Sequence, residues 1–145
     1  MKDLQMLVIE DDLDHFHMID GALRTSGVDS VTHFATGDAF FQFLMRCPQD
    51  ERSAEGTFSV ILDMRLPGMS GEEVLKKLKS REDWARIPVI VLTTSEDPEL
   101  ISRSHKLGCS YFIIKPVDAE EFKRAISQLG SFVSLVELPS PFRKV

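Results

Sequence analysis

The sequence predicts a doubly wound α/β fold built on a parallel sheet of five strands. Five short apolar runs recur along the chain, and segments with helical patterns separate them. A strand followed by a helix, five times over, gives a parallel sheet, and right-handed crossovers place helices on both of its faces. The 145 residues fit one domain, and an apolar content of 43% is enough to fill its core.

The strands differ in how deeply they are expected to be buried. The runs "SVIL" and "VIVL" are unbroken and apolar, which is typical of central strands that are covered on both faces. The segment "SVTHFA" mixes polar and apolar residues and favours an edge strand. The predicted strands are residues 6–9, 31–34, 58–62, 89–92 and 111–114.

Two of the intervening segments carry clear helix signals. Residues 70–80, "SGEEVLKKLKS", place acids in the first turn and apolar residues along one face. Residues 96–108, "EDPELISRSHKLG", have Pro98 near the start and Gly108 at the end, as a helix prefers.

We expect residues 1–145 to form a single domain with a short C-terminal extension over about 131–145. The extension, "SFVSLVELPSPFRKV", should prolong the last helix with more apolar surface than a closing helix needs, until Pro139 stops it. The polar, irregular segment 47–57 is predicted to be a long surface loop.

Composition excludes several classes of function. The 23 acidic and 17 basic residues give a net charge of -6, which disfavours binding to nucleic acid. No apolar run approaches the roughly 18 residues that a membrane span needs, so we expect a cytoplasmic protein without a membrane partner. Cys47 and Cys109 lack the spacing of metal ligands and are interpreted as reduced thiols.

Reactive side chains follow the predicted strands at their carboxyl ends, where parallel sheets bind ligands. Glu10 and Asp11 end the first strand, Asp63 the third, Thr93 the fourth and Lys115 the fifth. If the first and third strands are neighbours, their carboxylates face each other. Repulsion between carboxylates about 4 Å apart is about 4 kcal/mol per pair at an effective dielectric constant of 20. Such a cluster needs a cation.

The arrangement also indicates a chemistry. Oxygen ligands that leave room for water favour Mg²⁺, and Lys115 adds a fixed positive charge. With that neutralisation, Asp63 could attack a phosphoryl group and form an acyl phosphate. Thr93 could then donate a hydrogen bond to a phosphoryl oxygen that exists only in the modified state, which would make the site a switch.

Each of these residues has an ordinary structural explanation when it is taken singly. Asp63 could be a turn acid, Thr93 a strand-end hydroxyl and Lys115 a solvated charge. Their coincidence at four strand ends favours a site. Asp12 and Asp14 are instead interpreted as acids that complement the start of a helix.

The four histidines are not expected to contribute to the site. His15 and His17 are two apart on a predicted helix, so they point to different faces and make a poor metal pair. His33 and His105 have no partner that the sequence reveals.

The motifs "MLVIEDD", "VILDMRLPGMSG", "PVIVLTTS" and "YFIIKP", in this order and spacing, resemble the receiver domain of two-component response regulators over residues 4–128. The resemblance implies a flavodoxin-like fold with strand order 2-1-3-4-5. It also implies a usually cis bond between Lys115 and Pro116. The roles it implies are an acidic pair at Glu10 and Asp11, a phosphoacceptor at Asp63, a metal-binding backbone carbonyl at Arg65, a switch hydroxyl at Thr93, an aromatic switch at Phe112 and the family's lysine at Lys115.

The same resemblance implies a function in phosphorelay signal transduction. A histidine kinase would transfer its phosphoryl group to Asp63 with Mg²⁺ as cofactor, and this would switch protein contacts. Such a receiver catalyses its own phosphorylation and dephosphorylation and is no enzyme for a separate substrate. The loop 47–57, "LTTSED" and the extended C-terminal end resemble stand-alone receivers paired with phytochrome-type histidine kinases.

A homodimer is a further implication. In similar proteins the fourth helix, fifth strand and fifth helix form the dimer face, which the apolar tail would enlarge. Packing of the tail on its own core explains its composition equally well.

Three other functions compete with this interpretation. A flavin-binding carrier needs a phosphate loop after the first strand, where this chain has "EDDLDH". A Mg²⁺-dependent phosphohydrolase would carry Asp-x-Asp, whereas Met64 and Arg65 follow Asp63. The remaining alternative is a degenerate receiver that acts as a constitutive protein-docking module.

Overall fold

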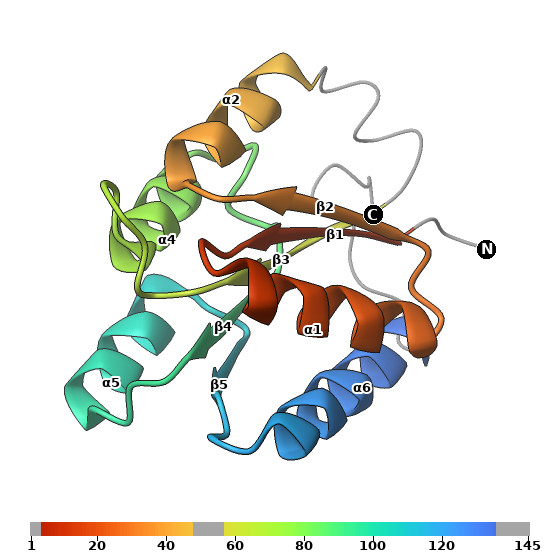
Figure 1. Cartoon of the computed structure of the whole chain (residues 1–145). Coiled ribbons are helices and arrows are strands. Elements are labelled where there is room, and N and C mark those ends of the chain that lie inside the picture. The colour runs from red at the N-terminus through yellow and green to blue at the C-terminus, as the bar shows by residue number, and fades with distance from the viewer. Residues whose placement is uncertain (1–3, 48–56, 136–145) are drawn as a thin grey trace.

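The computed structural model describes residues 4–47 and 57–135, which form one sheet between two layers of helices (Figure 1). All pairings are parallel, and the strand order is β2-β1-β3-β4-β5, which confirms the predicted fold class. The strands are β1 Leu4–Ile9, β2 Ser30–Phe34, β3 Thr57–Leu62, β4 Val89–Thr93 and β5 Tyr111–Ile114.

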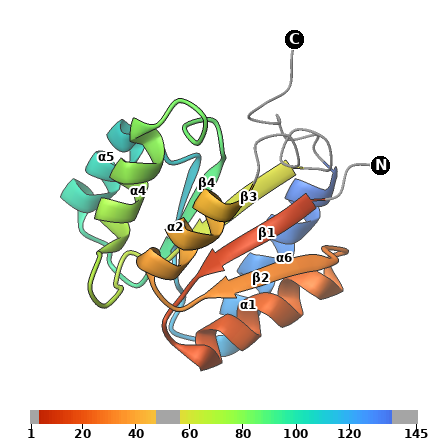
Figure 2. The same cartoon turned by 90° about the horizontal axis from the view of Figure 1, so that it is seen from above.

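The helices divide into a pair and a group of three on opposite faces of the sheet (Figure 2). One face carries α1 (Leu13–Thr25) and α6 (Ala119–Leu135), which pack against each other. The other carries α2 (Gly37–Arg46), α4 (Gly71–Ser80) and α5 (Pro98–Leu107). In the described part of the chain no helix has the length and apolar character of a membrane span.

The core is divided by the sheet into two apolar clusters. Side chains alternate between the faces of each strand, so in β1 Leu7 and Ile9 join one cluster while Met6 and Val8 join the other. Strand β4 is buried along its whole length, as its apolar run predicted, whereas β2 at the edge is only partly covered. The sheet is therefore fixed from both sides.

Helix ends follow the sequence signals. The Asp12 side chain caps α1 by accepting from the backbone N–H groups of Asp14 and His15, which confirms its interpretation as a helix-start acid. Pro98 lies in the first turn of α5, and Gly108 ends that helix with a φ of 103°, a conformation that glycine adopts without strain.

The start of α4 explains why a glycine follows the third strand. Gly71 approaches the backbone of the β3 end so closely that a Cβ atom there would lie 2.5 Å from the Met64 Cα. The Gly71 N–H donates to the Met64 carbonyl at 3.2 Å. The loop after β3 can therefore fold back tightly beneath Asp63.

The Lys115–Pro116 bond, the loop 47–57 and the C-terminal extension were each the subject of an expectation. The bond between Lys115 and Pro116 is not cis, because the described residues contain no cis peptide bond; trans is the intrinsically favoured isomer. Nearly all of the predicted loop 47–57 lies outside the described residues. The predicted prolongation of the last helix is confirmed as far as Leu135, and the remainder of the extension lies outside the described residues.

Candidate functional site

The register of the sheet brings the acids together. Ile9 of β1 pairs with Leu62 of β3, so the residues that follow, Glu10 and Asp63, leave the sheet side by side. The Asp63 N–H donates to the Ile9 carbonyl at 3.1 Å and holds the two strand ends together. Glu10 and Asp63 are buried, with exposed fractions of 1% and 7%, whereas Asp11 is exposed.

The three carboxylates form a cluster that suits a divalent cation. One oxygen each from Glu10, Asp11 and Asp63 lies within 4.8 Å of the others. The pKa of Glu10 is raised to about 7, chiefly by burial and also by the neighbouring Asp63 carboxyl, while Lys115 acts in the opposite sense. Hard, negatively charged oxygen donors that repel one another at this range fit a small divalent cation.

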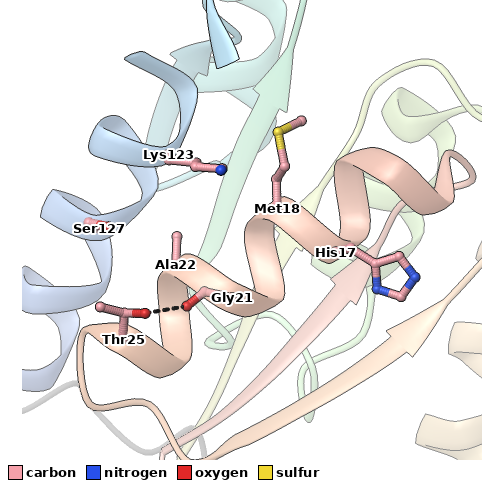
Figure 3. A pocket seen from close by; sticks show the side chains of 7 residues that line it. All are labelled: His17, Met18, Gly21, Ala22, Thr25, Lys123 and Ser127. Atoms are coloured by element: carbon pink, nitrogen blue, oxygen red, sulfur yellow. Dashed lines mark hydrogen bonds between the residues drawn. The ribbon is translucent and has the colours of Figure 1, made fainter. Parts of the chain in front are cut away.

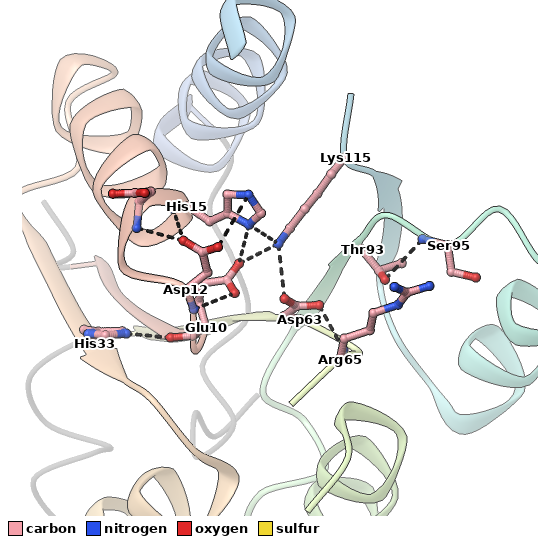
Figure 4. A network of polar contacts seen from close by, with 10 residues as sticks. Glu10, Asp12, His15, His33, Asp63, Arg65, Thr93, Ser95 and Lys115 are labelled. Carbon is pink, nitrogen blue, oxygen red and sulfur yellow. Dashed lines mark hydrogen bonds and ion pairs between the residues drawn. The ribbon is translucent and has the colours of Figure 1, made fainter. Parts of the chain in front are cut away.

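Lys115 supplies positive charge inside the cluster (Figure 4). Its exposed fraction is 5%, and its Nζ lies 2.6 Å from Glu10 Oε1 and 3.1 Å from Asp63 Oδ2. The backbone N–H of Lys115 donates to the Thr93 carbonyl at 2.6 Å, which fixes the end of β5 against the end of β4. The strand ends thus place the lysine between the two buried carboxylates.

Thr93 and Arg65 lie beside this cluster. Thr93 is fully buried, and its Oγ1 accepts the Ser95 N–H at 3.4 Å. The Arg65 N–H donates to Asp63 Oδ1 at 3.0 Å and so orients the carboxylate. The Arg65 side chain itself is exposed, and binding of a metal by its carbonyl stays a prediction.

Phe112 lies on β5, the strand that precedes Lys115. It pairs with Val91 in the sheet, is half-buried and packs against the core cluster on the α4 and α5 face. Its ring centroid is 6.4 Å from that of His105. Its switch role stays a prediction.

The structure adds two histidines that sequence reasoning missed. His15 Nδ1 lies 3.1 Å from Lys115 Nζ, and the His33 ring donates through Nε2 to the Glu10 carbonyl at 2.7 Å. The expectation that His33 has no partner was wrong, because its ring also stacks on Phe16 at a centroid distance of 4.0 Å. The spacing of the histidines gave no signal, and the position of His15 in the helical turn after the acids does not by itself show which way its ring points.

His105 also has a neighbour, away from the acidic cluster. Its Nδ1 lies 3.7 Å from the sulfur of Cys109, which follows the end of α5. The expectation that it has no partner was therefore wrong as well, although it takes no part in the site.

Comparisons with known proteins agree with this geometry. The response regulator receiver domain family matches residues 6–127. Response regulator Rcp1 of Synechocystis is 29% identical over 137 residues, which are 93% of this chain and 92% of Rcp1. The Mn²⁺-bound structure of Rcp1 superposes with a TM-score of 0.82 at 28% identity, covering 94% of this chain and 99% of that one.

Two further solved structures are similar over nearly the whole chain. A receiver domain from Rhodospirillum rubrum has a TM-score of 0.85 at 36% identity, covering 94% of this chain and 97% of that one. The phosphorylated cyanobacterial phytochrome response regulator RcpA has a TM-score of 0.84 at 27% identity, covering 97% and 100%. Family match, strand order and acidic cluster agree, and this chain belongs to the receiver domain family of response regulators.

Proposed function

We propose that this receiver domain accepts a phosphoryl group on Asp63 from a phosphohistidine of a sensor histidine kinase, with Mg²⁺ as cofactor, and thereby switches its protein contacts. The observation that carries the proposal is the placement of Asp63. Its buried carboxylate lies within 4.8 Å of two other carboxylates and 3.1 Å from a buried lysine ammonium. A structural acid would need neither.

In the proposed reaction an oxygen of Asp63 forms a bond to phosphorus. The phosphorus–nitrogen bond of the donor breaks, and its electron pair stays on the imidazole. Lys115 would neutralise charge on the phosphoryl oxygens, since its Nζ already lies against Asp63 Oδ2. The Arg65 N–H on the other oxygen, Oδ1, would hold the carboxylate in orientation.

Glu10, Asp11, Asp63 and the Arg65 carbonyl would hold the metal. Bound there, Mg²⁺ would neutralise the carboxylates and the oxygens of the transferred group. The ion in the Rcp1 structure supports a divalent metal at such a site, although that ion is Mn²⁺. We infer Mg²⁺ for this chain from the all-oxygen donor set.

A phytochrome-type kinase is the proposed phosphodonor. RcpA is a phytochrome response regulator and its structure is phosphorylated, which supports both the partner and the modification. The match to RcpA over 97% of this chain makes the same class of donor the natural candidate.

The test is intact mass after incubation with acetyl phosphate, with and without Mg²⁺. We expect one Mg²⁺-dependent phosphoryl adduct in the wild type and none in Asp63→Asn. Asp11→Ala should lose the dependence on Mg²⁺ together with most of the rate. A folded wild-type protein without an adduct would contradict the proposal and favour a constitutive protein-docking module.

The proposed switch uses Thr93 and Phe112. The Thr93 hydroxyl would donate to a phosphoryl oxygen, and the loop from Ser95 would follow because its N–H is bonded to that hydroxyl. Phe112, on the neighbouring strand, would turn inward as the loop moves.

We therefore expect Thr93→Ala to be phosphorylated but to show no change in partner affinity. Affinity for the kinase, measured for the phosphorylated and unphosphorylated forms of wild type and variant, checks this. Equal phosphorylation-dependent changes in both proteins would contradict the role of Thr93.

The proposed homodimer would use the face of α5, β5 and α6, the fourth and fifth helices and the fifth strand of the described fold. Tyr111 on β5 is 46% exposed there, which leaves aromatic surface for a contact. Sedimentation with and without the phosphoryl mimic beryllofluoride tests it, and a strict monomer in both states would contradict it.

A further inference from the structure

We propose that His15 is a positioning residue that holds the Lys115 ammonium in place for phosphoryl transfer. The inference rests on the proposed function of Asp63 and deepens it. It starts from the 3.1 Å contact between His15 Nδ1 and Lys115 Nζ, which joins the first turn of α1 to the end of β5 across 100 positions of sequence.

The contact with His15 gives the Lys115 ammonium its third polar neighbour. An ammonium has three donors and no acceptor, and Lys115 Nζ has three polar neighbours: Glu10 Oε1 at 2.6 Å, Asp63 Oδ2 at 3.1 Å and His15 Nδ1. Two of these neighbours are carboxylates of the acidic cluster formed by Glu10, Asp11 and Asp63. His15 is the one anchor that neither belongs to the three clustered carboxylates nor receives the phosphoryl group.

A hydrogen bond from Lys115 to His15 requires one tautomer of the ring. Because Lys115 can only donate, the contact is a hydrogen bond when Nδ1 presents its lone pair and the proton sits on Nε2. Nε2 is 4.0 Å from Asp12 Oδ2, which favours a proton on that side. Nδ1 is 3.7 Å from Glu10 Oε1, so the contact with Lys115 at 3.1 Å is what selects the tautomer with its lone pair on Nδ1. The capping residue of α1 therefore supports the tautomer that Lys115 requires.

The ring itself is held by the fold. The His15 N–H donates to Asp12 Oδ1 at 3.1 Å, and the ring lies against Phe122 of α6 with centroids 5.9 Å apart. The side chain is 34% exposed, so one edge faces solvent while Nδ1 faces the site.

This placement matters because a lysine side chain is long and flexible. Unless its ammonium is fixed before the reaction, ordering it costs free energy when the phosphoryl group arrives. Phosphorylation also removes the negative charge that one Asp63 oxygen offered to Lys115. His15 is unchanged by the reaction and can hold the lysine before and after transfer.

Three variants test the role. His15→Leu keeps the apolar packing against Phe122 but removes the acceptor. His15→Asn restores an acceptor, because its Oδ1 lies at the same distance along the side chain as Nδ1, and its helix propensity is similar. His17→Leu is the matched control on the same helix: His17 is among the residues that line a pocket together with Lys123 and Ser127 of α6, and its ring extends away from α6 (Figure 3).

The measurement is the rate of phosphorylation by acetyl phosphate at saturating Mg²⁺. We expect His15→Leu to be about tenfold slower, which corresponds to about 1.4 kcal/mol, and His15→Asn and His17→Leu to stay within about threefold of wild type. A merely structural role would also change Mg²⁺ affinity and the melting temperature. Both should stay near wild type in His15→Leu.

A second readout does not depend on phosphorylation. Ring ¹⁵N chemical shifts of His15 at neutral pH should show the proton on Nε2, and the Lys115→Met variant should lose this preference. A proton on Nδ1 in the wild type would overturn the inference. So would loss of rate in His15→Asn equal to that in His15→Leu, since the acceptor would then be irrelevant.

The outcomes separate this inference from the proposed function. A wild-type protein that gains no phosphoryl group would overturn the function of Asp63 and with it the role of His15. Normal phosphorylation of the wild type, together with an unchanged rate in His15→Leu, would overturn the positioning role alone.

Discussion

Lys115 is buried and Lys79 is half-buried, and the fold uses the two lysines in opposite ways. The Lys115 ammonium lies between two buried carboxylates, with Nζ–O distances of 2.6 and 3.1 Å. The Lys79 ammonium donates to two backbone carbonyls, of Ala85 at 2.8 Å and Ile87 at 2.9 Å. One lysine is surrounded by negative charge and the other by neutral dipoles.

The two environments shift the pKa values of different groups. Burial lowers the pKa of Lys79, and only Cys109 opposes this weakly, because carbonyl dipoles do not fully replace water around a charge. Beside Lys115 it is Glu10 whose ionisation is disfavoured: burial and the neighbouring Asp63 carboxyl raise the pKa of Glu10 to about 7, and Lys115 opposes this rise. Lys79 is thus satisfied by nearby backbone carbonyls, whereas Lys115 lies among carboxylates in excess of its own charge.

The largest effect is expected for Lys115→Met, which leaves two buried carboxylates without their cation. Removing one partner of a buried ion pair costs about 3–5 kcal/mol of unfolding free energy. Loss of the charge near the phosphoryl oxygens should slow phosphorylation by about 10²-fold or more. Urea unfolding in EDTA and the acetyl phosphate assay measure the two effects.

Measuring the stability of Lys115→Met with added Mg²⁺ tests this prediction further, because the cation would neutralise the same carboxylates. The stability loss of Lys115→Met should therefore shrink at saturating Mg²⁺, while the loss of rate persists. A variant that is as stable as the wild type in EDTA would show that the Lys115 contacts do not offset the repulsion between the acids.

The next effect is the pH dependence of Glu10→Gln in metal-free protein. Between pH 4.5, the ordinary pKa of Glu10, and about 7, its pKa in the fold, the folded protein holds a proton that the unfolded chain has released. Wild-type stability from this group therefore falls as the pH rises through that window. Above pH 7 the loss amounts to about 3 kcal/mol.

Glutamine cannot ionise, so the unfolding free energy of Glu10→Gln should rise relative to that of the wild type as the pH rises. The two proteins should be similar at pH 5 and differ by up to about 3 kcal/mol at pH 8. Urea unfolding in EDTA at each pH measures this, and the contributions of acids that do not interact with Glu10 cancel in the difference. A constant difference across the range would rule out a raised pKa for Glu10.

Much of the site could be predicted because a parallel sheet gathers its carboxyl ends whatever the details of the loops. Once the first and third strands pair, Glu10 and Asp63 must meet, and the run "YFIIKP" places Lys115 at the end of a neighbouring strand. Strand pairing is specified by apolar runs that the sequence displays plainly.

The histidines could not be predicted in the same way. Whether His15 reaches Lys115 depends on how α1 is rotated about its axis, and α1 is oriented by its packing on α6, far along the chain. His33 bonds to Glu10 through a side chain of the adjacent strand, a contact that depends on reach and not on spacing. The isomer of the Lys115–Pro116 bond was likewise expected from resemblance alone.

The smallest loss of stability is expected for Lys79→Met. Lys79→Met removes two hydrogen bonds that hold the segment between α4 and β4, but it leaves no buried carboxylate behind. Because desolvation of the ammonium already offsets part of those bonds, we expect a loss of only about 1–2 kcal/mol in unfolding free energy. Phosphorylation and Mg²⁺ affinity should not change. Urea unfolding and the acetyl phosphate assay measure both, and a slower reaction in Lys79→Met would mean that the α4–β4 segment, through β4, positions Thr93 and with it the site.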